Sequence, residues 1–316
     1  MTSTAPAPAA TREALGPTLI RLQQEGLDLV VCDADLGNST SARAFRNEFP
    51  ERFFTFGIAE QNMVSAAAGI ATLGSSVFVS TFAVFAEHAY DQLRMAVAQP
   101  NLNITFVASH GGVSAGEDGA SAQSIEDIAV MSSLVNFRVI VPADVVESAA
   151  AVEAAARTPG PFYIRTARAK TSVLYADGPR FELGKATPMR DGGDVTLISY
   201  GLMVERTLEA AESLAGEGID ARVLNMATIR PLDVDALEAA ARETGAIVVA
   251  EEHLMHSGLG AMAAQALATR HPVPMEFVGV DNRYGESGTW SEVMDVMGLT
   301  ADRITEAARR AVARKA

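Results

Sequence analysis

The 316 residues carry a net charge of −14, with 48% hydrophobic and 20% charged side chains, which is the composition of a soluble globular protein. The length exceeds what one hydrophobic core usually holds, so two domains are expected. The acidic balance argues against nucleic acid and anionic membranes as partners. The single cysteine, Cys32, excludes an internal disulfide framework and fits a reducing cytoplasm.

The first half of the chain predicts an α/β domain. Residues 1–10 are rich in alanine and proline and lack the regions of a signal peptide, so they are expected to form a disordered tail. From residue 11 onward, apolar runs of strand length alternate with segments of helical period. Strands are expected at 27–32, 77–80, 103–109, 138–141 and 162–165, and helices at 11–25, 83–98, 124–134 and 143–157. Such alternation is typical of a doubly wound fold over residues 11–170.

A second alternating unit follows a stretch of glycine, proline and charge. Residues 171–193 are expected to be a linker, and residues 194–316 a second doubly wound domain. Its strands are expected at 195–200, 221–226, 247–250 and 275–280, and its helices at 204–217, 234–243, 258–269 and 301–314.

Glu60 stands out because it places a carboxylate in a run of apolar and small residues, GIAEQNM at 57–63. It lies between a short strand expected at 52–56 and a helix rich in small residues. In the first turn of that helix the dipole favours a carboxylate. Spacing alone therefore favours an ordinary glutamate at a helix start.

The segment 57–63 also resembles the glutamate motif of the pyrimidine-binding domain in the transketolase family of thiamine-diphosphate enzymes. The resemblance implies that Glu60 hydrogen-bonds N1′ of the cofactor's aminopyrimidine. A buried carboxyl group can share its proton with N1′ and favour the imino form, which then takes the proton from C2 of the thiazolium. The cofactor carries the difficult chemistry, and the protein supplies orientation and one acid.

Two further segments bear on the cofactor. Phe82 and Phe85 lie three residues apart on one face of an expected helix start, which by itself indicates core packing. The resemblance implies that they form the aromatic pocket around the aminopyrimidine, with Phe85 as the stacking partner and His88 where a third aromatic often stands. Asp35 and Leu36, in the polar loop that follows the first strand, are expected to contribute to cofactor binding, because open α/β sheets bind ligands at such strand ends.

The glycine-rich loop 109–123 contains Gly-Glu-Asp-Gly at 116–119 and resembles the substrate loop of transketolases. The resemblance directs His110 toward hydroxyl or phosphate groups of the sugar and Asp118 toward the C2 hydroxyl of the acceptor aldehyde. A histidine at a strand end, bonded to the backbone, is the alternative for His110. The family pattern has a histidine before Gln123, where this chain has Ala122, so one donor to the developing oxyanion is absent.

Recognition of a phosphate needs cations, and arginine suits it through its bidentate fork. Arg12, Ser39 and Arg168 match the phosphate-binding positions of the family, and Arg165 is expected nearby. These three matches come from three separate segments, which favours a phosphorylated sugar as substrate.

The C-terminal half also resembles the transketolases, at 228–233, 250–253 and 258–260. The resemblance implies a mostly structural domain that supports dimerisation, so His253 and His256 are interpreted as packing or surface residues. The Gly-Asp-Gly motif that holds the diphosphate through Mg²⁺ in this superfamily is absent from the chain. The chain is therefore expected to hold no metal itself and to need an N-terminal, diphosphate-binding subunit, most simply as α2β2.

The sequence thus predicts the C-terminal subunit of a two-chain transketolase, with thiamine diphosphate clamped between the chains and Mg²⁺ held mainly by the partner. Two alternatives stay open. One is the β subunit of another two-chain thiamine enzyme, such as a 2-oxo acid dehydrogenase or a deoxyxylulose-type synthase. The other is a non-catalytic scaffold subunit, which the alanine at position 122 would suit.

Overall fold

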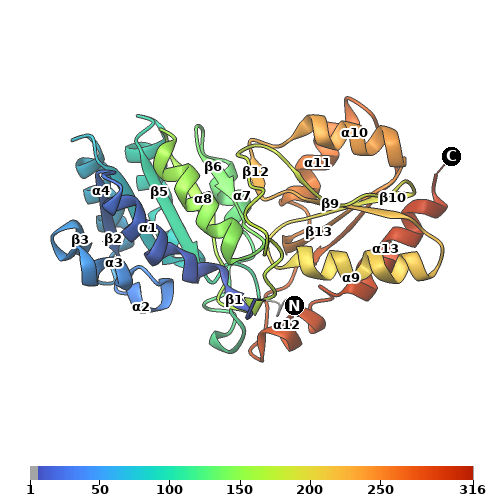
Figure 1. The fold of residues 1–316 in the computed structure, drawn as a ribbon, viewed down its shortest axis with the longest axis horizontal. Coiled ribbons are helices and arrows are strands. Elements are labelled where there is room, and N and C mark those ends of the chain that lie inside the picture. The colour runs from blue at the N-terminus through green and yellow to red at the C-terminus, as the bar shows by residue number, and fades with distance from the viewer. Residues whose placement is uncertain (1–5, 316) are drawn as a thin grey trace.

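The computed structural model describes residues 6–315, which form two α/β units side by side along the long axis of the molecule (Figure 1). The first unit is built on a seven-stranded sheet in the order β12-β6-β7-β5-β4-β2-β3. Its strands are β2 (Leu29–Asp33), β3 (Phe53–Thr55), β4 (Ser76–Phe82), β5 (Ile104–Ser109), β6 (Arg138–Ile140), β7 (Phe162–Arg165) and β12 (Thr228–Arg230). All neighbours pair in parallel except β12, which is antiparallel to β6.

Helices cover both faces of this sheet, as a doubly wound fold requires. They are η1 (Thr11–Ala14), α1 (Leu15–Gln24), α2 (Gly37–Thr40), α3 (Arg43–Glu48), α4 (Glu60–Ala71), α5 (Ala83–Ala86), α6 (Tyr90–Gln92), α7 (Asp127–Ser132) and α8 (Val145–Arg157), with short turns η2 (Pro50–Arg52), η3 (Glu87–Ala89), η4 (Leu93–Ala98) and η5 (Gly116–Asp118). Apolar side chains of α1, α3 and α8 share one core with the sheet. Those of α4, α7 and η4 share the other.

The second unit has a five-stranded sheet in the order β14-β13-β10-β11-β9. Its elements are β9 (Thr187–Arg190), β10 (Val195–Ser199), α9 (Met203–Gly216), β11 (Ala221–Asn225), α10 (Val234–Thr244), β13 (Ile247–Leu254), α11 (Leu259–Ala268), β14 (Met275–Val280), α12 (Trp290–Val296) and α13 (Ala301–Ala313). Helices α9 and α13 pack on one face and α10 and α11 on the other. The prediction of an α/β fold with two doubly wound domains is confirmed.

The helix expected at 83–98 is wrong as a single element. The segment breaks into α5, η3, α6 and a π-helical turn at Leu93–Ala98. At the break, Ala89 leaves helical geometry, and the carbonyl of His88 accepts a hydrogen bond of 3.0 Å from Nε2 of Gln61. The side chain of Gln61 thus donates to a carbonyl group that would accept a main-chain hydrogen bond in a continuous helix.

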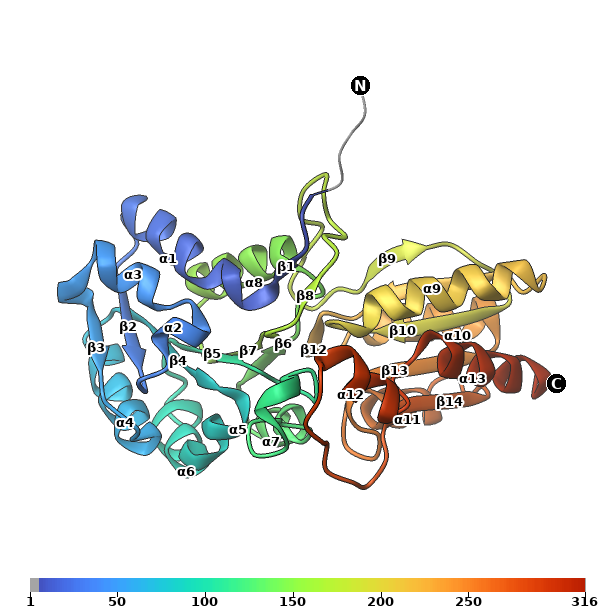
Figure 2. The same cartoon turned by 90° about the horizontal axis from the view of Figure 1, so that it is seen from below.

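Three corrections concern the ends and junctions of the predicted units. Ala9 and Ala10 are not part of a disordered tail, because they form β1 and pair antiparallel with β8 (Lys170–Thr171) between the two units (Figure 2). Residues 1–5 of that expected tail lie outside the described residues. The expected linker 171–193 contains β9, the antiparallel edge strand of the second sheet. Strand β12 returns from the second unit to pair with β6 of the first sheet.

Strand β13 is longer than expected and runs to Leu254, so Glu251, Glu252 and His253 lie within it. All three side chains are buried. Helix α12 was not anticipated, and it begins with a capping box formed by Thr289 and Glu292. No helix within residues 6–315 is long and apolar enough to cross a membrane.

Candidate active site

The sequence-predicted site residues gather at the carboxyl ends of β2, β3, β4 and β5, which lie together because these strands are parallel neighbours. Asp33 is the last residue of β2 and pairs with Thr55 and Ser80. Phe82 ends β4 and pairs with Ser109 at the end of β5. The segments that follow these strands therefore line one edge of the sheet.

Glu60 is the first residue of α4, which follows a turn whose Gly57 has a φ of +67°. Its side chain is only 7% exposed, and Oε2 lies 3.6 Å from Nδ1 of His88. The helix holds this position because Met63 and Val64, on its next turn, are fully buried in the core. The predicted catalytic carboxyl is thus buried beside His88, at a helix start whose dipole favours a negative charge.

Four rings form a continuous row that leads away from Glu60. The rings of His88 and Phe85 have centres 5.7 Å apart, and those of Phe85 and Phe82 are stacked at 5.6 Å with planes inclined by 10°. Phe82 then stacks on His110 at 3.7 Å. Phe82 is buried, whereas Phe85 is partly accessible. The structure thus brings Phe82, Phe85 and His88 together with both Glu60 and His110.

His110 has a φ of +61° and is 2% exposed. Its Nδ1 lies 2.7 Å from Oγ of Ser109, and its Nε2 lies 3.5 Å from Nη1 of Arg12 and 3.7 Å from Oδ2 of Asp118. Burial, followed by the charges of Arg12 and Arg168, lowers the pKa of His110 to about 3, so the ring is neutral. Because arginine has only donors, its contact favours the tautomer in which Nε2 accepts and Nδ1 donates to Ser109.

The predicted phosphate-binding residues lie around His110. Nη1 of Arg12 donates to the main-chain oxygen of Ser39 at 2.6 Å, so the backbone of Ser39 makes this contact. Nη1 of Arg168 donates to Oε2 of Glu117 at 2.6 Å and to the carbonyl of Ala115 at 3.0 Å. Burial, and after it the positive charge of Arg168, lowers the pKa of Arg12. The two guanidinium groups therefore lie close enough to repel each other. Asp118 is half-exposed beside them.

Arg165 lies nearby, beside Gly111, but its guanidinium group turns toward the second unit rather than toward Arg12 and Arg168. Its side chain is 3% exposed, with Nη1 3.6 Å from Asp127 and Nη2 3.9 Å from Oε2 of Glu252. Asp35 and Leu36 lie at the end of β2. Asp35 is exposed, with a φ of +65°, in a small pocket that Arg43 and Arg46 also line. The nitrogen of Leu36 donates to Oδ1 of Asp33 at 3.3 Å.

Ala122, where the family pattern has a histidine, is buried, and its amide donates to the carbonyl of Gly119 at 3.0 Å. Two further residues of the site, Glu87 and Glu252, were not predicted. Glu87 accepts a hydrogen bond from Oγ of Ser124 at 2.9 Å, and burial followed by the charge of Glu126 raises its pKa to about 7. Glu252 reaches the loop 109–123 from β13. The acidic pair Glu251-Glu252 at the end of an apolar run marks the position in the sequence but does not indicate its role.

These side chains fit an aminopyrimidine ring. A buried carboxyl can meet a ring nitrogen, and the accessible face of Phe85 can stack on the ring. A diphosphate with its cation needs several oxygen ligands. Within residues 6–315, no group of three or more His, Cys, Asp or Glu side chains is placed to hold a metal ion.

Two family models together match most of the chain. The model of the transketolase pyrimidine-binding domain matches residues 7–172, and that of the transketolase C-terminal domain matches residues 184–304. A putative transketolase C-terminal section of Methanocaldococcus jannaschii is 39% identical over 93% of this chain and 94% of its own length. A 6-deoxy-6-sulfo-D-fructose transketolase subunit of Clostridium sp. is 38% identical over 94% of this chain and 92% of its own.

Among solved structures, a split gene transketolase, described as an inactive β4 tetramer, superposes with a TM-score of 0.91. It is 44% identical and covers 97% of this chain and 99% of its own. The chain spans about half the length of other relatives, such as transketolase-like protein 2 of Mus musculus, 41% identical over 96% of this chain and 49% of its own. The chain therefore belongs to the transketolase family of transferases, in which it corresponds to the C-terminal section of a split transketolase.

Proposed function

We propose that this chain is the C-terminal subunit of a two-chain, thiamine-diphosphate-dependent transketolase that moves a two-carbon ketol unit between sugar phosphates. The observation that supports this most is the row of four rings. It joins a buried carboxyl, Glu60, at one end to His110 and its neighbouring arginines at the other. An acid for the cofactor and cations for a phosphate thus lie at the two ends of one site.

Glu60, Phe85 and His88 would hold the aminopyrimidine, with Phe82 behind Phe85 and with Asp35 and Leu36 at the margin. Thiamine diphosphate supplies the carbon nucleophile when it is bound. Glu60 holds or releases a proton at N1′, from a position that the remainder of the chain buries.

The sugar would lie between the rings and the arginines. Neutral His110 presents Nε2 as an acceptor, so it takes a hydrogen bond from a sugar hydroxyl, and Asp118 accepts from the C2 hydroxyl of the acceptor aldehyde. Arg12 and Arg168 bind the phosphate through charge-assisted hydrogen bonds, with the hydroxyl of Ser39 as a further donor. Arg168, which binds Glu117 in this structure, would exchange that carboxylate for the phosphate.

The partner is an N-terminal transketolase subunit that holds the diphosphate and most of the Mg²⁺ ligands, in an α2β2 assembly in the cytoplasm. It also supplies the oxyanion donor that Ala122 lacks. Exposed apolar side chains near Glu60 suit such an interface, since Ile58 is 87% exposed and Phe54 is 44% exposed. Cys32 suits a reducing compartment, because it is a buried thiol whose pKa burial raises to about 12.

Reconstitution tests the proposal. The chain is combined with an N-terminal transketolase subunit from the same genome, thiamine diphosphate and Mg²⁺, and ketol transfer from xylulose 5-phosphate to an aldose phosphate is assayed. We expect activity only when both chains are present. Decarboxylation of pyruvate instead would favour the 2-oxo acid dehydrogenase alternative, and a stable complex that binds no cofactor would favour a scaffold.

A further inference from the structure

The substrate loop between β5 and α7 rests on the second unit. The amide of Ser114 donates to Oε1 of Glu252 at 2.6 Å, and Nε2 of Gln123 donates to the carbonyl of Glu286 at 2.9 Å. The amide of Leu254 donates to the carbonyl of Ile125, also at 2.9 Å. Both halves of the loop therefore bind the C-terminal domain, for which the family resemblance implies a mostly structural role.

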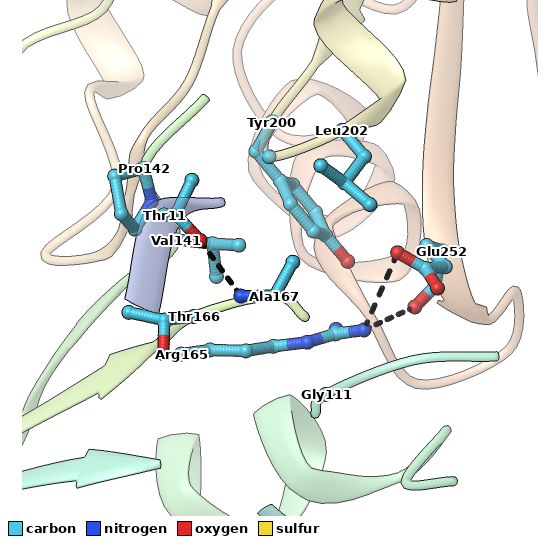
Figure 3. Close-up of a pocket in the computed structure, with 11 residues that line it drawn as sticks. Thr11, Gly111, Val141, Pro142, Arg165, Thr166, Ala167, Tyr200, Leu202 and Glu252 are labelled. Carbon is cyan, nitrogen blue, oxygen red and sulfur yellow. Dashed lines mark hydrogen bonds and ion pairs between the residues drawn. The ribbon is translucent and has the colours of Figure 1, made fainter. Parts of the chain in front are cut away.

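Glu252, from the second unit, contacts both the loop, at Ser114, and the first sheet, at Arg165. Its side chain is 6% exposed, and it lies over the end of the Arg165 side chain, above Gly111 (Figure 3). Nη2 of Arg165 donates to its main-chain oxygen at 2.9 Å. Burial raises the pKa of Glu252, and the charge of Arg165 and the amide of Ser114 oppose that rise.

The loop backbone packs directly against the side chains of Arg165 and Glu252, because the loop has glycine at positions 111 and 112. A Cβ on Gly111 would lie 2.1 Å from Nε of Arg165, and a Cβ on Gly112 would lie 2.2 Å from Cδ of Glu252. Gly112 also has a φ of +78°, which favours glycine. His110 immediately precedes these glycines, so the Arg165 and Glu252 side chains fix the direction in which the chain leaves it.

We propose that Glu252 is a positioning residue for the transketolase site: from the C-terminal domain, it holds the substrate loop so that His110 and Asp118 keep their places. The inference rests on the proposed function, since it assigns that loop to the sugar. Because the C-terminal domain holds this loop, the contact between the two domains also affects substrate binding. When the hydrogen bond to Ser114 is lost, the loop samples other positions, and only the fraction of molecules with an ordered loop binds sugar.

A matched pair of variants isolates this role. Glu252→Asp keeps the charge opposite Arg165 but shortens the side chain by one methylene, which draws the carboxylate away from Ser114. Glu251→Asp makes the same change one residue earlier on β13. Glu251 is equally buried, but it accepts from the amides of Leu259 and Gly260 and from the hydroxyl of Tyr200, so it supports the second unit without touching the loop. Glu252→Gln keeps the length and one acceptor oxygen.

The first measurement is hydrogen exchange in the full chain, which needs neither partner nor activity. We expect amides of the loop around Ser114 to exchange about tenfold faster or more in Glu252→Asp, the effect of losing a hydrogen bond to a charged group. Glu251→Asp should leave the loop as in the wild type, and Glu252→Gln should restore most of the protection. Equal loop exchange in the two Asp variants would overturn the proposal.

The second measurement is the KM for sugar substrate in the reconstituted complex. Glu252→Asp should raise KM severalfold with a smaller change in kcat, whereas Glu251→Asp should leave KM unchanged while lowering the melting temperature. A fall in kcat alone in Glu252→Asp would also overturn the positioning role. If the wild-type complex transfers no ketol unit, the proposed function fails, and the exchange experiment still decides whether Glu252 anchors the loop.

Discussion

The ring of Phe82 lies nearly flat against the imidazole of His110, with ring centres 3.7 Å apart and planes inclined by 23°. The contact follows from the sheet, because Phe82 at the end of β4 pairs with Ser109, the residue before His110. It presses an uncharged imidazole against an apolar face. His110 is thereby fixed as a neutral hydrogen-bonding group at the end of the aromatic row.

The first prediction concerns the charge of His110. Its pKa in the folded chain is lowered from 6.5 to about 3, so the folded protein stays unprotonated there while the unfolded chain takes up a proton below pH 6.5. Stability is therefore lost as pH falls from 6.5 toward 3, and none is lost above 6.5. Urea unfolding at pH 7.5 and pH 5 should show the wild type losing about 2 kcal/mol more than His110→Asn. Equal losses in the two proteins would show that His110 titrates normally.

The second prediction concerns the arginines. Arg12→Ala or Arg168→Ala should raise the KM for a phosphorylated acceptor about tenfold or more, because each removes a charge-assisted hydrogen bond. The KM for the same sugar without its phosphate should hardly change. Steady-state kinetics of the reconstituted complex with both acceptors makes the comparison. Arg303→Ala is a suitable control, since Arg303 is exposed on α13 and pairs with Glu306. An equal loss with both acceptors would place the phosphate elsewhere.

The third prediction concerns the N-terminal strand. Deleting residues 1–10 removes β1, which lies just before Thr11 and Arg12, and with it the pairing of β1 with β8. The hydroxyl of Thr11 still accepts from the amide of Ala167 at 2.7 Å, so the fold should survive. We expect an unchanged melting temperature and a severalfold higher KM for the phosphorylated acceptor. Deleting residues 1–5 leaves β1 in place and serves as the control, and identical kinetics for the two deletions would contradict a role for β1.

The parallel strands could be predicted because buried strands appear as continuous apolar runs. Strand β7 (Phe162–Arg165) agrees with its prediction residue for residue. Strand β12 could not be found in this way. It has three residues, and its partner β6 lies about ninety residues earlier in the chain, so its pairing depends on tertiary structure rather than on local pattern. The break after α5 likewise depends on Gln61, a side chain from another helix.

The site could be predicted where the residues themselves carry the motif. The structure brings Glu60, Phe82, Phe85 and His88 together, and it places Arg12 beside His110. Roles that depend on the contact between the domains could not be predicted. Arg165 lies beside Gly111, near His110 as expected, but its guanidinium group is buried against the second unit, where β13 presents Glu252 to it. No sequence pattern in either segment indicates that Arg165 and Glu252 are in contact.

The fourth prediction addresses the central claim, that this chain gives the acid and another chain grips the charged end of the cofactor. The direct measurement is the kcat of the reconstituted two-chain complex carrying Glu60→Gln, compared with wild type at saturating thiamine diphosphate and Mg²⁺. If Glu60 transfers a proton at N1′ as proposed, its loss should lower kcat on the order of a hundredfold or more while the assembly stays intact. Adding Gln61→Glu to the Glu60→Gln variant should not restore the rate, because it puts the carboxyl group at a different position of α4. A Glu60→Gln complex that turns over at the wild-type rate would contradict the account.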